Sequence, residues 1–198
     1  MLEQKVYKNW IVETLQSTAF NKQMIIVNKN FSNLKQEGHI RNTLLILLNE
    51  MFEQQNLRYL ALSEYPRINH GRTDLSLTNL CDLSIPFKIE LKFQMKGDFV
   101  GHKNLAIRSM ELEKDLFDKQ SDLFMLIIIE WDDEHKEAYD RKIGLDSSLV
   151  KFNDNKMIDT WENGVEQVLS QRCRFTKETV IIDEPYFTKY HFYLVSAK

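Results

Sequence analysis

The feature that most constrains the fold is an alternation of apolar and polar residues over positions 87–96. The apolar residues are Phe87, Ile89, Leu91, Phe93 and Met95, and the polar residues between them are Lys88, Glu90, Lys92, Gln94 and Lys96. Successive side chains of a β-strand point to opposite faces. The alternation therefore predicts a strand with one face on a core and a polar opposite face.

The rest of the chain is expected to alternate between helices and strands. Apolar residues at helical spacing predict helices, and short apolar runs bounded by turn residues predict strands. We expect helices at 3–20, 37–55, 103–120 and 159–172, and strands at 23–27, 57–64, 72–78, 123–131, 179–183 and 190–196. This order predicts an α/β fold in which a central mixed β-sheet is flanked by helices.

The length of 198 residues suits a single domain. We expect its core at about 37–131, an N-terminal helical extension at 1–35 and a C-terminal elaboration at 140–198. The longest apolar run, 123–129, is far shorter than the roughly 18 residues of a membrane-spanning helix. The N-terminus also lacks the apolar core of a signal peptide. These observations predict a cytoplasmic protein without a membrane partner.

The net charge of −3 hides one strongly acidic segment. Residues 130–140 hold six acids and one base, so the remaining positions sum to a slightly positive charge. Nucleic-acid-binding proteins usually carry a surplus of Lys and Arg. The overall charge therefore neither supports nor excludes such a partner, and we expect the acidic segment to be an exposed loop.

Two acids and a lysine are expected to meet on the polar face of the alternating strand. Glu90 and Lys92 are two positions apart and share one face, and Asp74 lies on the polar side of the preceding strand. Carboxylates bind Mg²⁺, and a lysine beside the cation stabilises charge on a phosphodiester under attack. An acid two positions before a lysine occurs five times, but only Glu90 and Lys92 lie in a strongly alternating strand.

Asp74, followed sixteen residues later by Glu90-Leu91-Lys92, resembles the motif of the PD-(D/E)XK nuclease superfamily. The resemblance covers about 37–131 and implies a restriction-endonuclease-like core in the order αβββαβ. Many members carry a glutamate on the first helix, for which Glu37 is the best match and Glu50 the second. The chain departs from the family name at Thr73, where a proline is implied.

The resemblance implies a Mg²⁺-dependent endonuclease that hydrolyses phosphodiester bonds, with Mn²⁺ as a substitute for Mg²⁺. Asp74, Glu90 and the backbone carbonyl of Leu91 would hold the cation. Lys92 would orient the attacking water, and Glu37 would contact the metal through water or bind a second ion. Further phosphate contacts are expected from Arg41, Arg72 and Gln94.

DNA rather than RNA is the expected substrate, in a restriction or phage-defence role. One chain offers one site, so cleavage of a duplex predicts a homodimer with one site for each strand. Two other interpretations stay open: a catalytically inactive nuclease-fold module that binds nucleic acid or a protein partner, and an unrelated α/β protein whose acids are surface residues. For the aromatic segment 186–193 we favour an edge strand over a surface that stacks bases.

Overall fold

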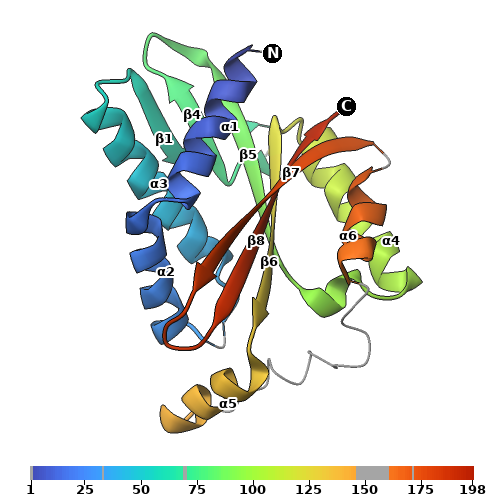
Figure 1. Ribbon diagram of the computed structural model, residues 1–198. Coiled ribbons are helices and arrows are strands. Elements are labelled where there is room, and N and C mark those ends of the chain that lie inside the picture. The colour runs from blue at the N-terminus through green and yellow to red at the C-terminus, as the bar shows by residue number, and fades with distance from the viewer. Residues whose placement is uncertain (1, 33, 69–70, 146–160, 171) are drawn as a thin grey trace.

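The structure is a computed structural model that describes residues 2–32, 34–68, 71–145, 161–170 and 172–198. Figure 1 shows a central sheet with helices on both faces. The helices are α1 (Leu2–Leu15), α2 (Thr18–Asn30), α3 (Glu37–Gln54), α4 (His102–Leu112), α5 (Asp133–Lys142) and α6 (Trp161–Ser170), with a 3₁₀ turn η1 (Lys96–Phe99) and a π-helical turn η2 (Glu113–Asp118). The strands are β1 (Tyr59–Ser63), β2 (Arg67–Ile68), β3 (Gly71–Arg72), β4 (Leu75–Asn79), β5 (Asp82–Met95), β6 (Leu123–Trp131), β7 (Cys173–Ile182) and β8 (Thr188–Ala197). The predicted α/β fold with a mixed sheet flanked by helices is confirmed.

The central sheet has six strands in the order β1-β4-β5-β6-β8-β7, and β2 pairs with β3 separately. β1, β4 and β5 form an antiparallel meander. The chain then crosses over through α4 and η2, and β6 runs parallel to β5. β8 and β7 complete the sheet with antiparallel pairing. The pairing of β4 with β5 extends only to Ile89, so the last residues of β5 continue past the end of β4.

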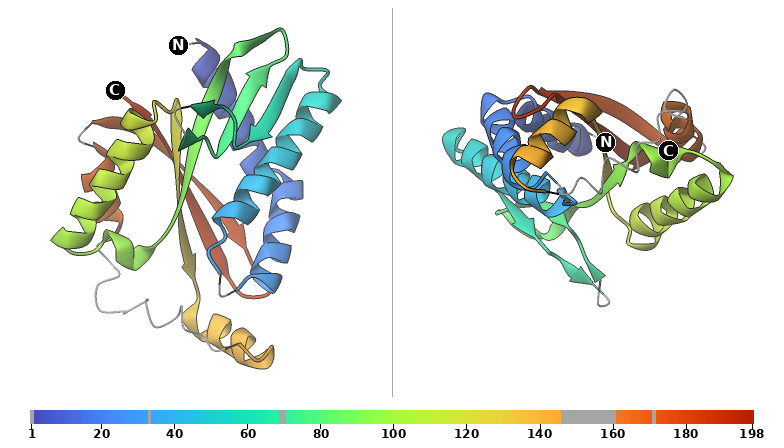
Figure 2. Two further views of the ribbon diagram at one scale, coloured as in Figure 1. Left: turned by 180° about the vertical axis from the view of Figure 1, so that it is seen from behind. Right: turned by 90° about the horizontal axis from the view of Figure 1, so that it is seen from below.

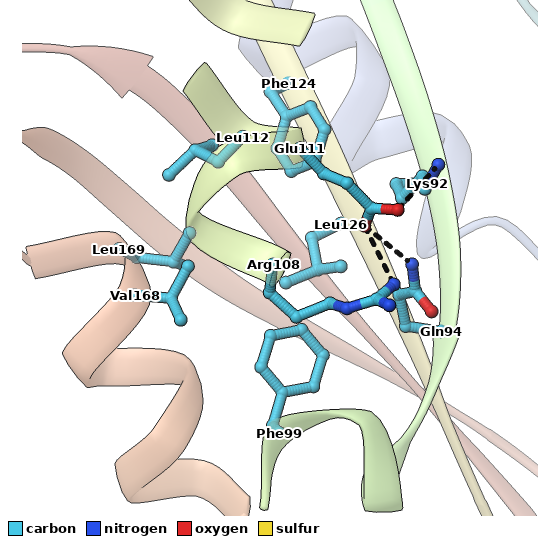
Figure 3. A pocket seen from close by; sticks show the side chains of 10 residues that line it. All are labelled: Lys92, Gln94, Phe99, Arg108, Glu111, Leu112, Phe124, Leu126, Val168 and Leu169. Carbon is cyan, nitrogen blue, oxygen red and sulfur yellow. Dashed lines mark hydrogen bonds and ion pairs between the residues drawn. The ribbon is translucent and has the colours of Figure 1, made fainter. Parts of the chain in front are cut away.

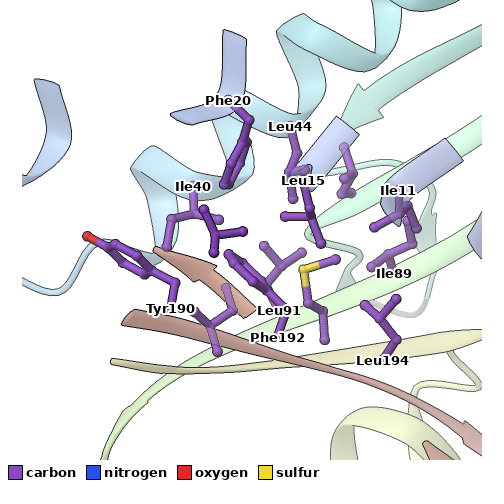
Figure 4. Packing of buried hydrophobic residues seen from close by; sticks show 14 of the residues in the cluster. Ile11, Leu15, Phe20, Ile40, Leu44, Ile89, Leu91, Tyr190, Phe192 and Leu194 are labelled. Carbon is purple, nitrogen blue, oxygen red and sulfur yellow. The ribbon is translucent and has the colours of Figure 1, made fainter. Parts of the chain in front are cut away.

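Each face of the sheet has its own apolar layer. The larger layer lies between the sheet and helices α1, α2 and α3, and it contains the odd-numbered residues of β5 from Phe87 to Phe93 (Figure 4). The smaller layer lies on the opposite face, beneath α4, η2 and α6 (Figure 2). Because β5 alternates as predicted, its even-numbered side chains face the α4 side. The polar face of β5 is therefore covered in part by the crossover segment.

The N-terminal region differs from its prediction. The helix expected at 3–20 divides into α1 and α2, and the strand expected at 23–27 is part of α2. Met24 and Val27 are buried, whereas Ile26 between them is 48% exposed. The apolar run therefore follows the period of a helix, with one side on the sheet.

The acidic segment 130–140 is not the expected exposed loop: it completes β6 and then forms most of α5. Asp132 caps the helix by accepting a hydrogen bond from His135 N at 3.0 Å. Acids in the first turn also interact favourably with the helix dipole. Lys136 and Asp140 of α5 are both 0% exposed, so this helix is docked through a buried ion pair.

The aromatic segment 186–193 enters β8, which confirms a strand but not an edge strand. β8 lies between β6 and β7, and β7 forms the edge. The position explains the aromatic composition, since Tyr190 and Phe192 are fully buried against the larger layer.

Within the described residues, no helix combines the length and the apolar character needed to cross a membrane.

Candidate active site

The predicted site lies where β4 ends beside β5. Past Ile89, backbone N–H groups on this edge of β5 donate to carboxylates in place of a neighbouring strand. The three bonds are Leu91 N to Asp74 Oδ2 at 2.9 Å, Phe93 N to Glu37 Oε2 at 2.7 Å and Met95 N to Asp98 Oδ2 at 2.9 Å. Acidic side chains are therefore fixed in a row along the strand edge, and two of them were predicted as site residues.

Asp74 and Glu90 form the centre of this site. Asp74 directly precedes β4, and the pairing of Leu75 with Ile89 places it beside Glu90. Glu90 is 1% exposed, and its Oε1 atom is buried without a hydrogen-bond partner in the described part of the chain. Burial raises the pKa of Glu90 to about 7; Lys119 opposes this rise, and the charge of Asp74 adds to it. One buried carboxylate oxygen of this acid pair is therefore available as a ligand.

Lys119 binds the other oxygen of Glu90. Its Nζ lies 2.7 Å from Glu90 Oε2 and 2.8 Å from Asp115 Oδ1. Burial lowers the pKa of Lys119, but the hydrogen bonds and charges of Asp115 and Glu90 raise it above its usual value. The ammonium is therefore a fixed positive charge between two buried carboxylates.

Lys92 projects from the same face of β5 toward α4 (Figure 3). Its Nζ lies 3.6 Å from Glu111 Oε1, and Gln94 Nε2 donates to Glu111 Oε2 at 3.2 Å. Arg108 also donates to Glu111 Oε2, at 2.8 Å. The Lys92 side chain is 31% exposed, so the ammonium can be approached from solvent while the carboxylate of Glu111 holds it.

Glu37 is the first residue of α3 and is half-buried. Burial raises its pKa; the bond from Phe93 N lowers it, and the charges of Asp74 and Lys92 act in opposite directions. Glu37 is therefore close to both predicted site residues. Glu50 is exposed farther along α3 and lines a different cavity with Glu13, so only Glu37 reaches the site.

The predicted phosphate contacts are engaged within the chain. Arg41 follows Glu37 by one helical turn and donates to the neighbouring Asn42 at 3.3 Å. Arg72 is exposed and pairs with Glu64 at 2.9 Å. Gln94 is buried and held by Glu111, as described above. Arg41 and Arg72 could reach a ligand by exchanging partners, whereas Gln94 belongs to the support of Lys92.

The residues at the edge of β5 beyond the end of β4 fit a divalent cation. The buried Glu90 Oε1 has no hydrogen-bond partner among the described residues, and Asp74 lies beside Glu90. The carbonyl of Leu91 faces the same strand edge as its N–H, which Asp74 accepts. Nowhere in the described ranges do three or more His, Cys, Asp or Glu side chains gather as a metal site. Mg²⁺ commonly takes one or two carboxylates and retains several waters, so this smaller set is sufficient.

Sequence reasoning missed the residues that support the site from the crossover helix. Glu111 pairs with Lys92, and Lys119 pairs with both Glu90 and Asp115. Their spacing of four positions places them on one side of the helix. This spacing was visible in the sequence. Which side of the helix packs on the sheet, however, depends on the tertiary structure.

A comparison with models of protein families finds no match to this chain, and comparisons with curated proteins and with solved structures find none either.

Proposed function

We propose that this protein is a Mg²⁺-dependent endonuclease that hydrolyses phosphodiester bonds of DNA. The observation that carries the proposal is the position of Asp74 beside Glu90, with a buried, unpartnered Glu90 Oε1 in the described structure. Lys92 lies two positions along the same strand face. Acids that gather a cation next to an accessible ammonium suit attack of water on a phosphodiester.

The strand order supports a restriction-endonuclease-like core. Helix α3 precedes the antiparallel meander β1-β4-β5, and α4 leads to the parallel strand β6. This is the αβββαβ order that the resemblance to PD-(D/E)XK nucleases implies. The acid Asp74 and the Glu90-Leu91-Lys92 motif fall on the second and third strands of the meander or directly beside them.

In the proposed mechanism, Asp74, Glu90 and the Leu91 carbonyl would hold the cation. The chemistry that Mg²⁺ would supply when bound is Lewis-acid polarisation of the phosphodiester and activation of water. Lys92 positions the attacking water and stabilises the negative charge that develops on the phosphate. Glu111 keeps the ammonium of Lys92 on the α4 side of the strand, and Glu37 restrains the strand edge through Phe93 N.

We expect Asp74→Asn and Lys92→Met each to reduce cleavage of plasmid DNA in Mg²⁺ by at least about 100-fold. Asp74→Asn removes a cation ligand, and Lys92→Met removes the ammonium. The measurement is the rate of plasmid nicking, with and without EDTA. Lys88→Met is the matched control, because Lys88 lies on the same face of β5 outside the site.

Cleavage that persists in EDTA, or in both site variants, would contradict the proposal. Binding of DNA without cleavage under all conditions would instead favour a catalytically inactive nuclease-fold module. Parallel reactions with RNA test the preference for DNA. Cleavage of both strands in a single encounter, together with the mass in solution, tests the proposed homodimer.

A further inference from the structure

We propose that Lys119 limits the site to a single divalent cation by occupying one of the two oxygens of Glu90. The inference rests on the proposed function of Asp74 and Glu90 as cation ligands, and it concerns how many ions they can hold. Lys119 contacts Glu90 directly, so it acts as a positioning residue for that carboxylate.

The two oxygens of Glu90 have different surroundings. Oε2 accepts a hydrogen bond from Lys119 Nζ at 2.7 Å. Oε1 is buried and has no hydrogen-bond partner among the described residues. A carboxylate whose one oxygen is bound by an ammonium group has only its other oxygen available to ligate a cation. Glu90 can therefore ligate one ion beside Asp74 and cannot bridge to another while Lys119 stays in place.

The ammonium of Lys119 occupies what would otherwise be a second cation position. Asp115 Oδ1 and Glu90 Oε2 lie within 2.8 Å of the same nitrogen atom, and both residues are buried. Without the ammonium, two buried carboxylate oxygens would face each other with no charge between them. A divalent cation is the natural replacement, because hard cations prefer carboxylate oxygens.

The π-helical turn η2 fixes this arrangement. Lys119 N donates to Lys114 O at 3.0 Å, a bond five positions back along the chain. Asp115 and Lys119 are four positions apart and form a pair on one side of the turn. Ser121 Oγ donates to the Asp115 carbonyl at 2.7 Å and joins the next segment to the turn. Such π-helical insertions occur frequently at functional sites.

Formal charges agree with a single ion. Asp74, Glu90 and Asp115 contribute three negative charges when ionised, and Lys119 returns one positive charge. One divalent cation neutralises the remaining two. Replacing Lys119 with a neutral residue leaves a third charge unbalanced and exposes the second pair of oxygens, so a second ion can bind.

The test is the number of Mn²⁺ ions bound per full-length chain, measured by electron paramagnetic resonance and isothermal titration calorimetry at pH 8. We expect one ion for the wild type and two for Lys119→Met. Lys119→Arg, which keeps the charge, should bind one ion. Lys114→Met should also bind one, because Lys114 is exposed on the same turn. The double substitution Lys119→Met with Asp115→Asn should return the number to one.

Two ions in the wild type, or one ion in both Lys119→Met and Lys119→Gln, would overturn the role of Lys119 while leaving the proposed nuclease site intact. Lys119→Gln provides a polar alternative if the methionine variant does not fold, which circular dichroism reveals. A wild-type chain that binds no Mn²⁺, or whose binding is unaffected by Asp74→Asn, would instead contradict the proposed function itself.

Discussion

Asp140→Asn is expected to lower the free energy of unfolding by about 3–5 kcal/mol, the usual effect of breaking a buried ion pair. Asp140 and Lys136 are both 0% exposed and form an ion pair within α5. The substitution keeps the shape of the side chain but removes its charge. The buried ammonium then loses the opposite charge that offsets its transfer out of water.

The surroundings of this pair make the effect large. Ser32 Oγ donates to Asp140, and Lys136 Nζ donates to Ser32 Oγ at 3.1 Å. The ammonium also lies 5.2 Å from the ring centre of Trp131 and 5.6 Å from that of Tyr186. The network joins α5 to the segment after α2 and to the approach to β8, so its loss loosens three parts of the fold together.

The same helix supplies a control. Glu137 and Arg141 form an ion pair of the same spacing at 3.9 Å, with side chains that are 49% and 70% exposed. Glu137→Gln is expected to change stability by less than about 0.5 kcal/mol. Urea denaturation of both variants measures the difference. Similar small effects in the two would show that the buried pair contributes no more than a surface pair.

The contrast between β5 and α5 shows what sequence patterns can predict. β5 alternates because one face packs on a core, and that local period places Glu90 and Lys92 together without knowledge of the rest of the fold. α5 buries Lys136 and Asp140, so its inner side looks solvent-exposed by composition. A pattern of apolar residues cannot identify the buried side of a helix when the buried residues are an ion pair.

The site residues also divide into those that the sequence pattern predicts and those that it does not. Asp74 and Glu90 could be predicted because both lie at positions fixed by neighbouring strands. Lys119 reaches Glu90, and brings Asp115 near it, only because the crossover segment folds back onto the sheet, which depends on tertiary contacts between distant segments. The spacing of these residues indicated a stripe on a helix, but nothing local indicates that the stripe faces a strand rather than solvent.

The second large effect is expected in the dependence of stability on pH without divalent cations. The pKa of Glu90 is about 7 in the folded protein, raised from 4.5 mainly by burial. Between these values the folded state retains a proton that the unfolded state has lost, so stability falls as pH rises. The difference corresponds to about 3 kcal/mol lost between pH 4.5 and 8. Denaturant unfolding in EDTA across this range measures the decline.

Two controls assign the decline to Glu90. Glu90→Gln removes the main titrating group and should remove most of the decline, with a smaller part left to Glu37, whose pKa burial also raises. Glu113→Gln, at an exposed pair with Arg172, should leave the profile unchanged. Glu130 has the opposite effect on the pH dependence of stability, and its effect falls in a different pH range. A hydrogen bond from His191 is the main reason that its pKa is lowered to about 2, so its contribution is lost only as pH falls below about 4.5. A decline that keeps its full size in Glu90→Gln would contradict the assignment.

Mg²⁺ should reverse the decline at pH 8. A cation that binds the ionised pair of Asp74 and Glu90 replaces the proton that the folded state would otherwise retain, and a ligand specific to the folded state adds its binding energy to stability. At pH 5 protons compete for Glu90, so the same Mg²⁺ concentration should have little effect. The stabilisation by Mg²⁺ should therefore grow between pH 5 and pH 8 in the wild type and be absent in Asp74→Asn. Equal stabilisation at both pH values would mean that the cation binds somewhere other than this acid pair.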